Sequence, residues 1–195
     1  MTIDLNTEEE TTMTRLYKLT DRKHQTKNAT QWGENVTHEA SGKGNLCGPG
    51  WLHAYTDPLL AVLLNPIHAS LSDPVLWEAK GKVGKTDHGL KVGCVKLTTL
   101  RIIPLPEITT EQRVRFAIFC ALEVCQEPAF VKWAENWLSG KDRSKKAAEA
   151  AAQAAARAAV RAVRVAAQAA ARAAVRAAEG GGKVDLIAFA RRAVS

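Results

Sequence analysis

The segment 147–178 consists almost entirely of Ala, interrupted by a regular row of polar residues. The decapeptide QAAARAAVRA occurs in it twice, fifteen residues apart. Ala has the highest helix propensity and Arg ranks close behind, so this composition predicts one long helix. The polar residues follow one another at spacings of three or four, which places them on one side of that helix. Five of them form a basic ridge: Arg157, Arg161, Arg164, Arg172 and Arg176.

The helix face opposite the basic ridge is almost pure Ala, which would allow a second helix to approach closely. A monomer would leave this face in water, so we expect a homo-oligomer assembled through it. Packing of the helix against the rest of its own chain and a single solvated helix are the alternatives. The residues expected at the oligomer interface are Ala151, Ala155, Ala158, Ala166, Ala170 and Ala173.

Charge is distributed unevenly along the chain. Residues 141–195 contain 12 of the 27 Lys and Arg but only 4 of the 20 Asp and Glu, a net charge of +8, whereas residues 1–140 have a net charge of −1. Attraction to nucleic acid should therefore be confined to the tail. Nucleic-acid binding through the basic ridge is an alternative function, and the competing explanation is that the arginines keep an Ala-rich helix soluble.

Changes in composition divide the chain into four predicted segments. Residues 1–12 are an acidic leader that we expect to be disordered, and residues 13–140 an α+β module. Residues 141–179 are the long Ala/Arg helix, and residues 180–195 a Gly linker with a short amphipathic helix. The predicted fold class is α+β, a small antiparallel sheet with packed helices followed by the long Ala-rich helix.

Within the α+β module, alternating and β-branched residues predict several strands and one hairpin. Asp57-Pro58 predicts the beginning of a helix and Asn65-Pro66 its end. A capping box at Thr109 begins a second helix and Pro128 a third, which ends at Ser139-Gly140. The expected strands are 15–19, a short one near 31–39, 51–56, and the hairpin strands 75–83 and 90–103.

Aromatic residues and histidines flank the Gly-rich loop 40–50. On a strand, residues 51, 53 and 55 would share one face. Aromatic rings with a His and a Lys beside such a loop could stack on a base and hold a phosphate, although the same rings could simply form core. The candidate ligand-binding residues are Trp32, His38, Lys43, Trp51, His53 and Tyr55.

The chain lacks the motifs of common catalytic and cofactor sites. Neither GxxxxGK[ST] nor GxGxxG is present, and no His and Cys residues have zinc-type spacing. Cys47 could act as a nucleophile with His53 or His38 as its base, or be an inert thiol. We expect no catalytic residue, no metal and no cofactor. The absence of a signal peptide and of a long apolar run, with free thiols, favours a cytoplasmic protein that does not enter a membrane.

The run WGENVTHEASGKGNLCGPGWLHAYTDPLLAVLLNPIH, followed by LWEAKGKVG and WAENWLSGKDRS, resembles a protein family of unknown function from phages and bacterial genomes. The similarity covers about residues 14–146, and several members carry Ala-rich tails. The resemblance implies a small α+β module and a host-takeover or anti-defence role in the cytoplasm of the host cell.

A second resemblance concerns LYK and GWLHAYTDPLLAVLL, which are similar to the first strand and the strand-to-helix motif of ADP-ribosyltransferase-like folds. Tyr17, His53, Tyr55 and Thr56 match, and Glu107 is the candidate for the acidic position. This resemblance implies an ADP-ribosyl-transferring enzyme as an alternative. The favoured hypothesis is a non-enzymatic protein that binds and sequesters a small anionic, nucleotide-like ligand or a host protein.

Overall fold

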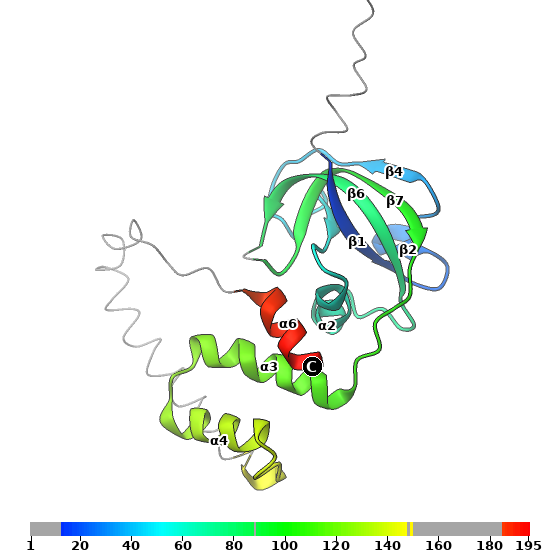
Figure 1. Cartoon of the computed structure of the whole chain (residues 1–195). Coiled ribbons are helices and arrows are strands. Elements are labelled where there is room, and N and C mark those ends of the chain that lie inside the picture. Colours follow the sequence, from blue (N-terminus) through cyan, green and yellow to red (C-terminus); the bar gives the residue numbers. More distant parts are fainter. Residues whose placement is uncertain (1–12, 88, 148, 150–184) are drawn as a thin grey trace, which may run out of the picture. The chain divides into compact units, whose positions relative to one another are not determined.

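The computed structural model describes residues 13–87, 89–147, 149 and 185–195 (Figure 1). The chain forms two compact units: unit 1 comprises Met1–Thr110 and Asp185–Ser195, and unit 2 comprises Glu111–Val184. The predicted α+β class is confirmed, because an antiparallel sheet and several helices are present. The division into units falls inside the segment 13–140, and the C-terminal helix belongs to unit 1.

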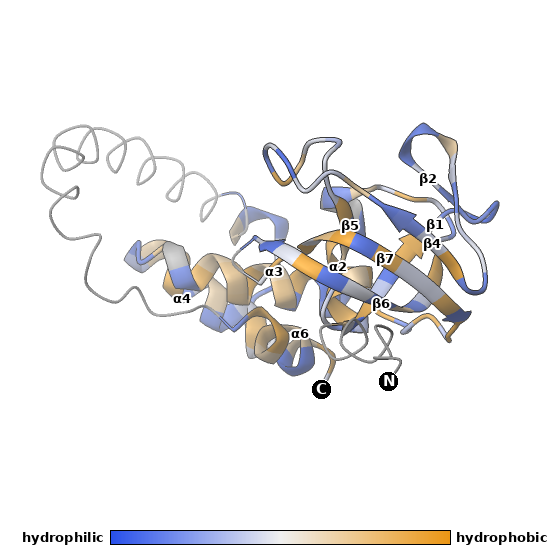
Figure 2. Cartoon of the chain, turned by 90° about the horizontal axis from the view of Figure 1, so that it is seen from above, coloured by the Kyte–Doolittle hydropathy of each residue, from blue (hydrophilic) through white to orange (hydrophobic). Residues whose placement is uncertain are grey.

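Unit 1 is built on a five-stranded sheet with the order β1-β6-β7-β4, in which β5 also pairs with β7. All of these pairings are antiparallel, and the long β6–β7 pair is the predicted hairpin. Apolar and polar residues are interspersed along these strands (Figure 2), and from Trp77 to Lys82 of β6 buried residues alternate with more exposed ones, so one face of this stretch is buried. The strands are β1 Thr14–Thr20, β4 Val36–Glu39, β5 Leu52–Ala54, β6 Val75–Thr86 and β7 Val92–Ile102.

The sheet curves until its first strand meets the end of β5. Tyr17 of β1 and Tyr55, which follows β5, exchange two backbone hydrogen bonds of 2.8 and 2.9 Å. Register shifts between β6 and β7 add to the bend, because a bulge increases local twist. One core cluster of unit 1 consists of Trp32, which follows β3, and of six strand residues: Leu16, Ala54, Ala79, Val92, Cys94 and Leu97.

A small two-stranded sheet lies between β1 and β4 in the sequence. It consists of β2 Gln25–Thr26 and β3 Thr30–Gln31, joined by the short 3-10 turn η1 Lys27–Ala29. Asn28 and Ala29 have positive φ values of 62° and 53°, which produce the tight reversal. The predicted strand near 31–39 is therefore found as two separate pieces, β3 and β4.

Helix α2, Pro58–His68, begins as predicted: the Asp57 carboxylate accepts a hydrogen bond of 2.8 Å from the backbone N–H of Leu59. The predicted end at Asn65-Pro66 is wrong, because the helix continues to His68. Asn65 holds the turn beyond the proline in place. Its carbonyl accepts from the N–H of Ala69, and its side-chain amide makes two hydrogen bonds to the backbone of Leu71.

Helix α2 is buried around its whole circumference. Five consecutive residues, from Leu60 to Leu64, are at most 5 % exposed, and five residues exceed one helical turn. The helix therefore needs cover on two sides. The sheet lies on one side, and helix α6, Leu186–Val194, packs on the other (Figure 1). This confirms the predicted C-terminal amphipathic helix.

The contact between α6 and α2 combines an apolar stripe with one ion pair. Leu186, Ala190 and Ala193 are buried and recur at helical spacing on one face of α6. The guanidinium of Arg191 lies 3.5 Å from the second carboxylate oxygen of Asp57. Asp57 thus caps the start of α2 and also binds α6.

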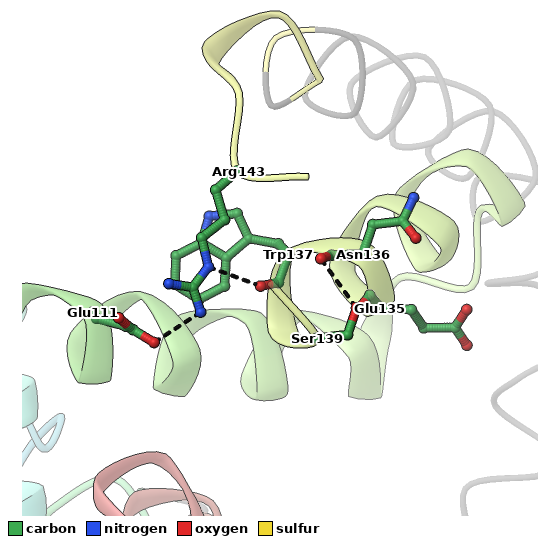
Figure 3. Close-up of polar contacts among 6 residues, drawn as sticks. All are labelled: Glu111, Glu135, Asn136, Trp137, Ser139 and Arg143. Atoms are coloured by element: carbon green, nitrogen blue, oxygen red, sulfur yellow. Dashed lines mark hydrogen bonds and ion pairs between the residues drawn. The ribbon is translucent and has the colours of Figure 1, made fainter. Parts of the chain in front are cut away.

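Unit 2 contains α3, Thr110–Val124, from its second residue on, and α4, Pro128–Leu138; the two helices pack through Ile118, Phe130 and Ala134. Beyond α4 the chain turns at Gly140, whose φ is +78°. Arg143 then reaches back over the helices (Figure 3): it donates 2.8 Å to Glu111, and its guanidinium lies 4.6 Å from the Trp137 ring centroid. The predicted face of α4 and its end at Ser139-Gly140 are confirmed.

Residues 145–147 and 149 are helical, and the Ser144 hydroxyl accepts a hydrogen bond of 3.2 Å from the N–H of Ala147. The predicted oligomer interface and basic ridge, residues 151–176, lie outside the described residues. Both stay predictions. No helix within the described ranges has the length and apolar character that a bilayer crossing demands.

The assembly prediction requires a variant that spares α6, since α6 belongs to unit 1. We expect the full chain to have a mass that is a multiple of 21.1 kDa in multi-angle light scattering. Replacing residues 150–183 with a Gly/Ser linker should give the monomer mass, because the Ala face is removed. A full chain that is already monomeric would contradict the prediction.

Candidate functional site

Unit 1 contains a cavity of about 680 Å³ bounded by the inner side of β1, the β2 segment, the Gly-rich loop, β5 and the end of α2. Cavities that hold small molecules usually have about 300–1,000 Å³. Three lysines and one aspartate are the charged residues of its wall. The lining residues are Lys18, Leu19, Asp21, Gln25, Thr26, Lys27, Cys47, His53, Tyr55, His68, Ala69, Leu71 and Lys91.

Lys18 is the most deeply placed cation of the cavity. It alternates with Leu16 on β1, so its side chain points to the inner face and is only 7 % exposed. Its ammonium donates 2.7 Å to the carbonyl of His53 and lies 4.9 Å from the ring centroid of Trp32. Burial lowers the pKa of Lys18 from 10.5 to about 8, although the nearby Cys94 acts in the opposite direction.

His53, Tyr55 and His68 form the aromatic part of the wall. His53 and Tyr55 lie two residues apart at β5, and His68 is the last residue of α2. The Tyr55 hydroxyl and His68 Nδ1 are 3.2 Å apart, and the two rings are stacked with centroids 6.0 Å apart. His53 Nε2 is hydrogen-bonded to the carbonyl of Leu46, which ties the Gly-rich loop to the cavity.

Lys91 brings a second buried ammonium group to the cavity. It lies directly before β7 and is 8 % exposed. A turn fixes its backbone, since its carbonyl accepts a hydrogen bond of 3.0 Å from the N–H of Asp87. Its side chain donates 3.3 Å to the sulfur of Cys47, which stands at the exposed side of the Gly-rich loop.

The ionisation states make the cavity positive at neutral pH. Burial lowers the pKa of His53 below 6.5, with smaller effects of Lys18 and Lys91, whereas the Leu46 carbonyl opposes the shift. Burial and then Lys91 lower the pKa of His68. Both imidazoles are therefore neutral, and burial keeps Tyr55 neutral too by raising its pKa to about 12. The lysines supply the charge.

Of the six predicted ligand-binding residues, His53 and Tyr55 line the cavity and the other four do not. Trp32 is 2 % exposed and supports Lys18 from behind, and its indole N–H donates 2.9 Å to Thr26. His38 packs edge-on against Trp32 and is hydrogen-bonded to the carbonyl of Gln31.

The remaining two predicted residues belong to the Gly-rich loop and its neighbour. The ring of Trp51 packs where Gly84 and Gly93 leave room on the hairpin, and its indole N–H donates 3.2 Å to Gly44. Lys43 has its backbone N–H bonded to Ser41. Trp51 thus holds the Gly-rich loop against the hairpin and does not line the cavity.

The structure gives no support to a Cys–His pair. The ring nitrogen of His53 is engaged by Leu46, and the partner of the Cys47 sulfur is Lys91. Cys94 is fully buried, and burial raises its pKa to about 11, which makes it an inert thiol. Within the described part of the chain, no three His, Cys, Asp or Glu residues gather as metal ligands.

Lys18 and Lys91 are candidate functional residues that the sequence analysis does not identify. A signal for Lys18 existed, because in the strand 15–19 it alternates with Leu16 and so belongs to the apolar face. Lys91 carried no comparable signal: it is one of several lysines near a turn, and only the pairing of Val92 with Ala54 brings it beside β5.

Fold and site together define an α+β protein with a positively charged cavity of small-molecule size. No protein-family model, curated protein or solved structure matches this chain. Glu107, the acidic residue that the ADP-ribosyltransferase resemblance requires, is exposed and is not part of the cavity wall.

Proposed function

We propose that this protein binds a small anionic, nucleotide-like ligand in the cavity of unit 1. The observation that carries the proposal is the pair of buried ammonium groups, Lys18 and Lys91, in the wall of one cavity. A buried charge is costly unless it is paired. This cost already lowers the pKa of Lys18. An anion bound between the two lysines would pair with their charges and so offset the cost of burial.

The shape and chemistry of the wall favour a ligand that joins a ring to an anionic group. The stacked Tyr55 and His68 offer flat apolar surface, and the lysines offer charge-assisted hydrogen bonds. Asp21 is the acidic residue of the wall. Its Oδ1 already accepts hydrogen bonds of 2.8 Å from the N–H groups of Lys23 and Gln25. These hydrogen bonds stabilise the carboxylate, and the three lysines of the wall outnumber its single negative charge.

Calorimetric titration with adenosine mono-, di- and triphosphate and with cyclic dinucleotides tests the proposal. We expect binding by the full chain and a loss of at least about tenfold in affinity for Lys18→Met and Lys91→Met, because a charged hydrogen bond contributes about 1.5–3 kcal/mol. The matched control is Lys82→Met, an exposed lysine of β6 outside the cavity. Titrations without heat for every anion, or an equal loss in the control, would refute the proposal.

The affinity should also depend on pH in one direction. An anion binds the ammonium form of Lys18, so affinity falls as pH rises through the pKa of about 8 in the free protein. The decrease should approach tenfold per pH unit between about pH 8 and about pH 10. Titrations with adenosine monophosphate across this range measure it. The affinity of the Lys18→Met variant should not change over this range. An affinity of the full chain that does not change with pH either would exclude a role of Lys18.

A further inference from the structure

The amine of Lys18 has two contacts that fix its position. Its nitrogen is held by the His53 carbonyl at 2.7 Å and lies over the ring of Trp32, while the side chain forms part of the cavity wall. The carbonyl only accepts a hydrogen bond, so it leaves the lone pair of a neutral amine available. Because Lys18 belongs to the cavity wall, its nitrogen is a candidate for reaction with a ligand held there.

We propose that Lys18 is a covalent attachment site, at which the amine condenses with the aldehyde or ketone group of a small anionic ligand and holds it as an imine. The inference rests on the proposed function, since Lys91 would hold the anionic group while Lys18 meets the carbonyl. The ligand class is therefore narrowed to anions that carry a reactive carbonyl, such as phosphorylated aldehydes.

Desolvation makes Lys18 a better nucleophile than a surface lysine. With a pKa of about 8, roughly a tenth of Lys18 is neutral at neutral pH, whereas a lysine with the ordinary 10.5 is neutral to less than about a thousandth. Lysines that form Schiff bases are activated in this way, by burial or by a neighbouring cation. Lys18 is buried, and Lys91 is a second cation in the same cavity wall.

The condensation balances with groups of the cavity. The neutral amine attacks the carbonyl carbon, a C–N bond forms, and the carbonyl oxygen becomes a hydroxyl. That oxygen then leaves as water, carrying both hydrogens of the amine, and a C=N bond remains. Tyr55, a neutral phenol of the same cavity wall that is hydrogen-bonded to His68 at 3.2 Å, is the candidate group for passing protons between nitrogen and oxygen.

Pyridoxal 5′-phosphate is a suitable probe because it joins an aldehyde, a phosphate and a ring. After reaction with the full chain and reduction with borohydride, peptide mapping by mass spectrometry should show at least about tenfold more adduct at Lys18 than at the exposed Lys82. Lys18→Arg should lose this adduct, and Lys82→Arg should keep it. Adducts spread over exposed lysines, with Lys18 unlabelled, would overturn the inference; the wild-type map decides this even when a variant fails to fold.

Pyridoxine 5′-phosphate, which lacks the carbonyl, separates the two proposals. Binding of this compound in calorimetry, without an adduct of the aldehyde at Lys18, would overturn covalent attachment and leave anion binding intact. Absence of binding for the nucleotides and for both pyridine phosphates would overturn both. Two results together support both proposals. Pyridoxine 5′-phosphate binds to the full chain, and the aldehyde forms an adduct at Lys18 that the variant Lys91→Met reduces at least about tenfold.

Discussion

The variant Lys18→Met is expected to bind anions at least about tenfold more weakly and yet to be more stable than the natural chain. Keeping the Lys18 ammonium buried lowers its pKa from 10.5 to about 8, which corresponds to a cost of about 3 kcal/mol in the free energy of unfolding at neutral pH. Loss of the hydrogen bond to the His53 carbonyl costs about 1 kcal/mol. The net gain should be about 2 kcal/mol.

The pH dependence identifies the cause of this gain. Below pH 8 the folded chain keeps Lys18 charged and bears the full cost. Between about pH 8 and about pH 10.5 the folded chain releases this proton while the unfolded chain retains it, so stability rises with pH. The stabilisation by Lys18→Met should therefore shrink over this interval and be largest at neutral pH.

Hydrogen exchange of the β1 and β6 amides, read by mass spectrometry, measures the free energy of unfolding in unit 1. Lys82→Met serves as the matched control, because this lysine is exposed on β6 and should change stability little. A destabilised Lys18→Met at neutral pH, or a difference that is the same at both ends of the pH range, would contradict the assigned burial cost.

Ala190→Asp should destabilise unit 1 by about 3 kcal/mol or more. Ala190 is fully buried on the α6 face that covers α2, so a carboxylate there would lose its hydration and gain no partner. Detachment of α6 is the structural change that would rehydrate the carboxylate at the lowest cost in free energy, and it would expose α2. Amides of α2 and of residues 186–194 should then lose hydrogen-exchange protection together.

Ala188→Asp is the matched control for this change. Ala188 lies on the exposed side of the same helix, and its N–H is already bonded to the Asp185 carboxylate. The same substitution there should alter stability by less than about 0.5 kcal/mol. Equal effects at both positions would mean that helix propensity, and not the packing of α6 on α2, determines the result.

Local patterns predicted the elements whose neighbours are close in sequence. The apolar face of α4, the cap of α2 at Asp57 and the β6–β7 hairpin follow from spacing and turn chemistry alone. The end of α2 is not predictable in this way, because Asn65-Pro66 reads as a helix stop and the helix nevertheless continues to His68. The contacts of Asn65 with Leu71, which stabilise the following turn, have no such signature.

The site was only half predictable, because distant pairings assemble it. Alternation beside the Gly-rich loop predicts His53 and Tyr55. Trp32 was expected against a ligand, but it lies beneath Lys18 and fills core space instead. Lys91 reaches the cavity only because β5 pairs with β7, a contact between segments that no local pattern links.

The ion pair between Asp57 and Arg191 joins residues 134 positions apart, and it closes a loop that contains unit 2 and the Ala-rich segment. The entropy of closing a loop grows only with the logarithm of its length, about 0.6 kcal/mol for each doubling. The duplicated decapeptide lies within this loop, with its two copies fifteen residues apart. Lengthening this loop by further repeats should therefore cost unit 1 and its cavity little stability.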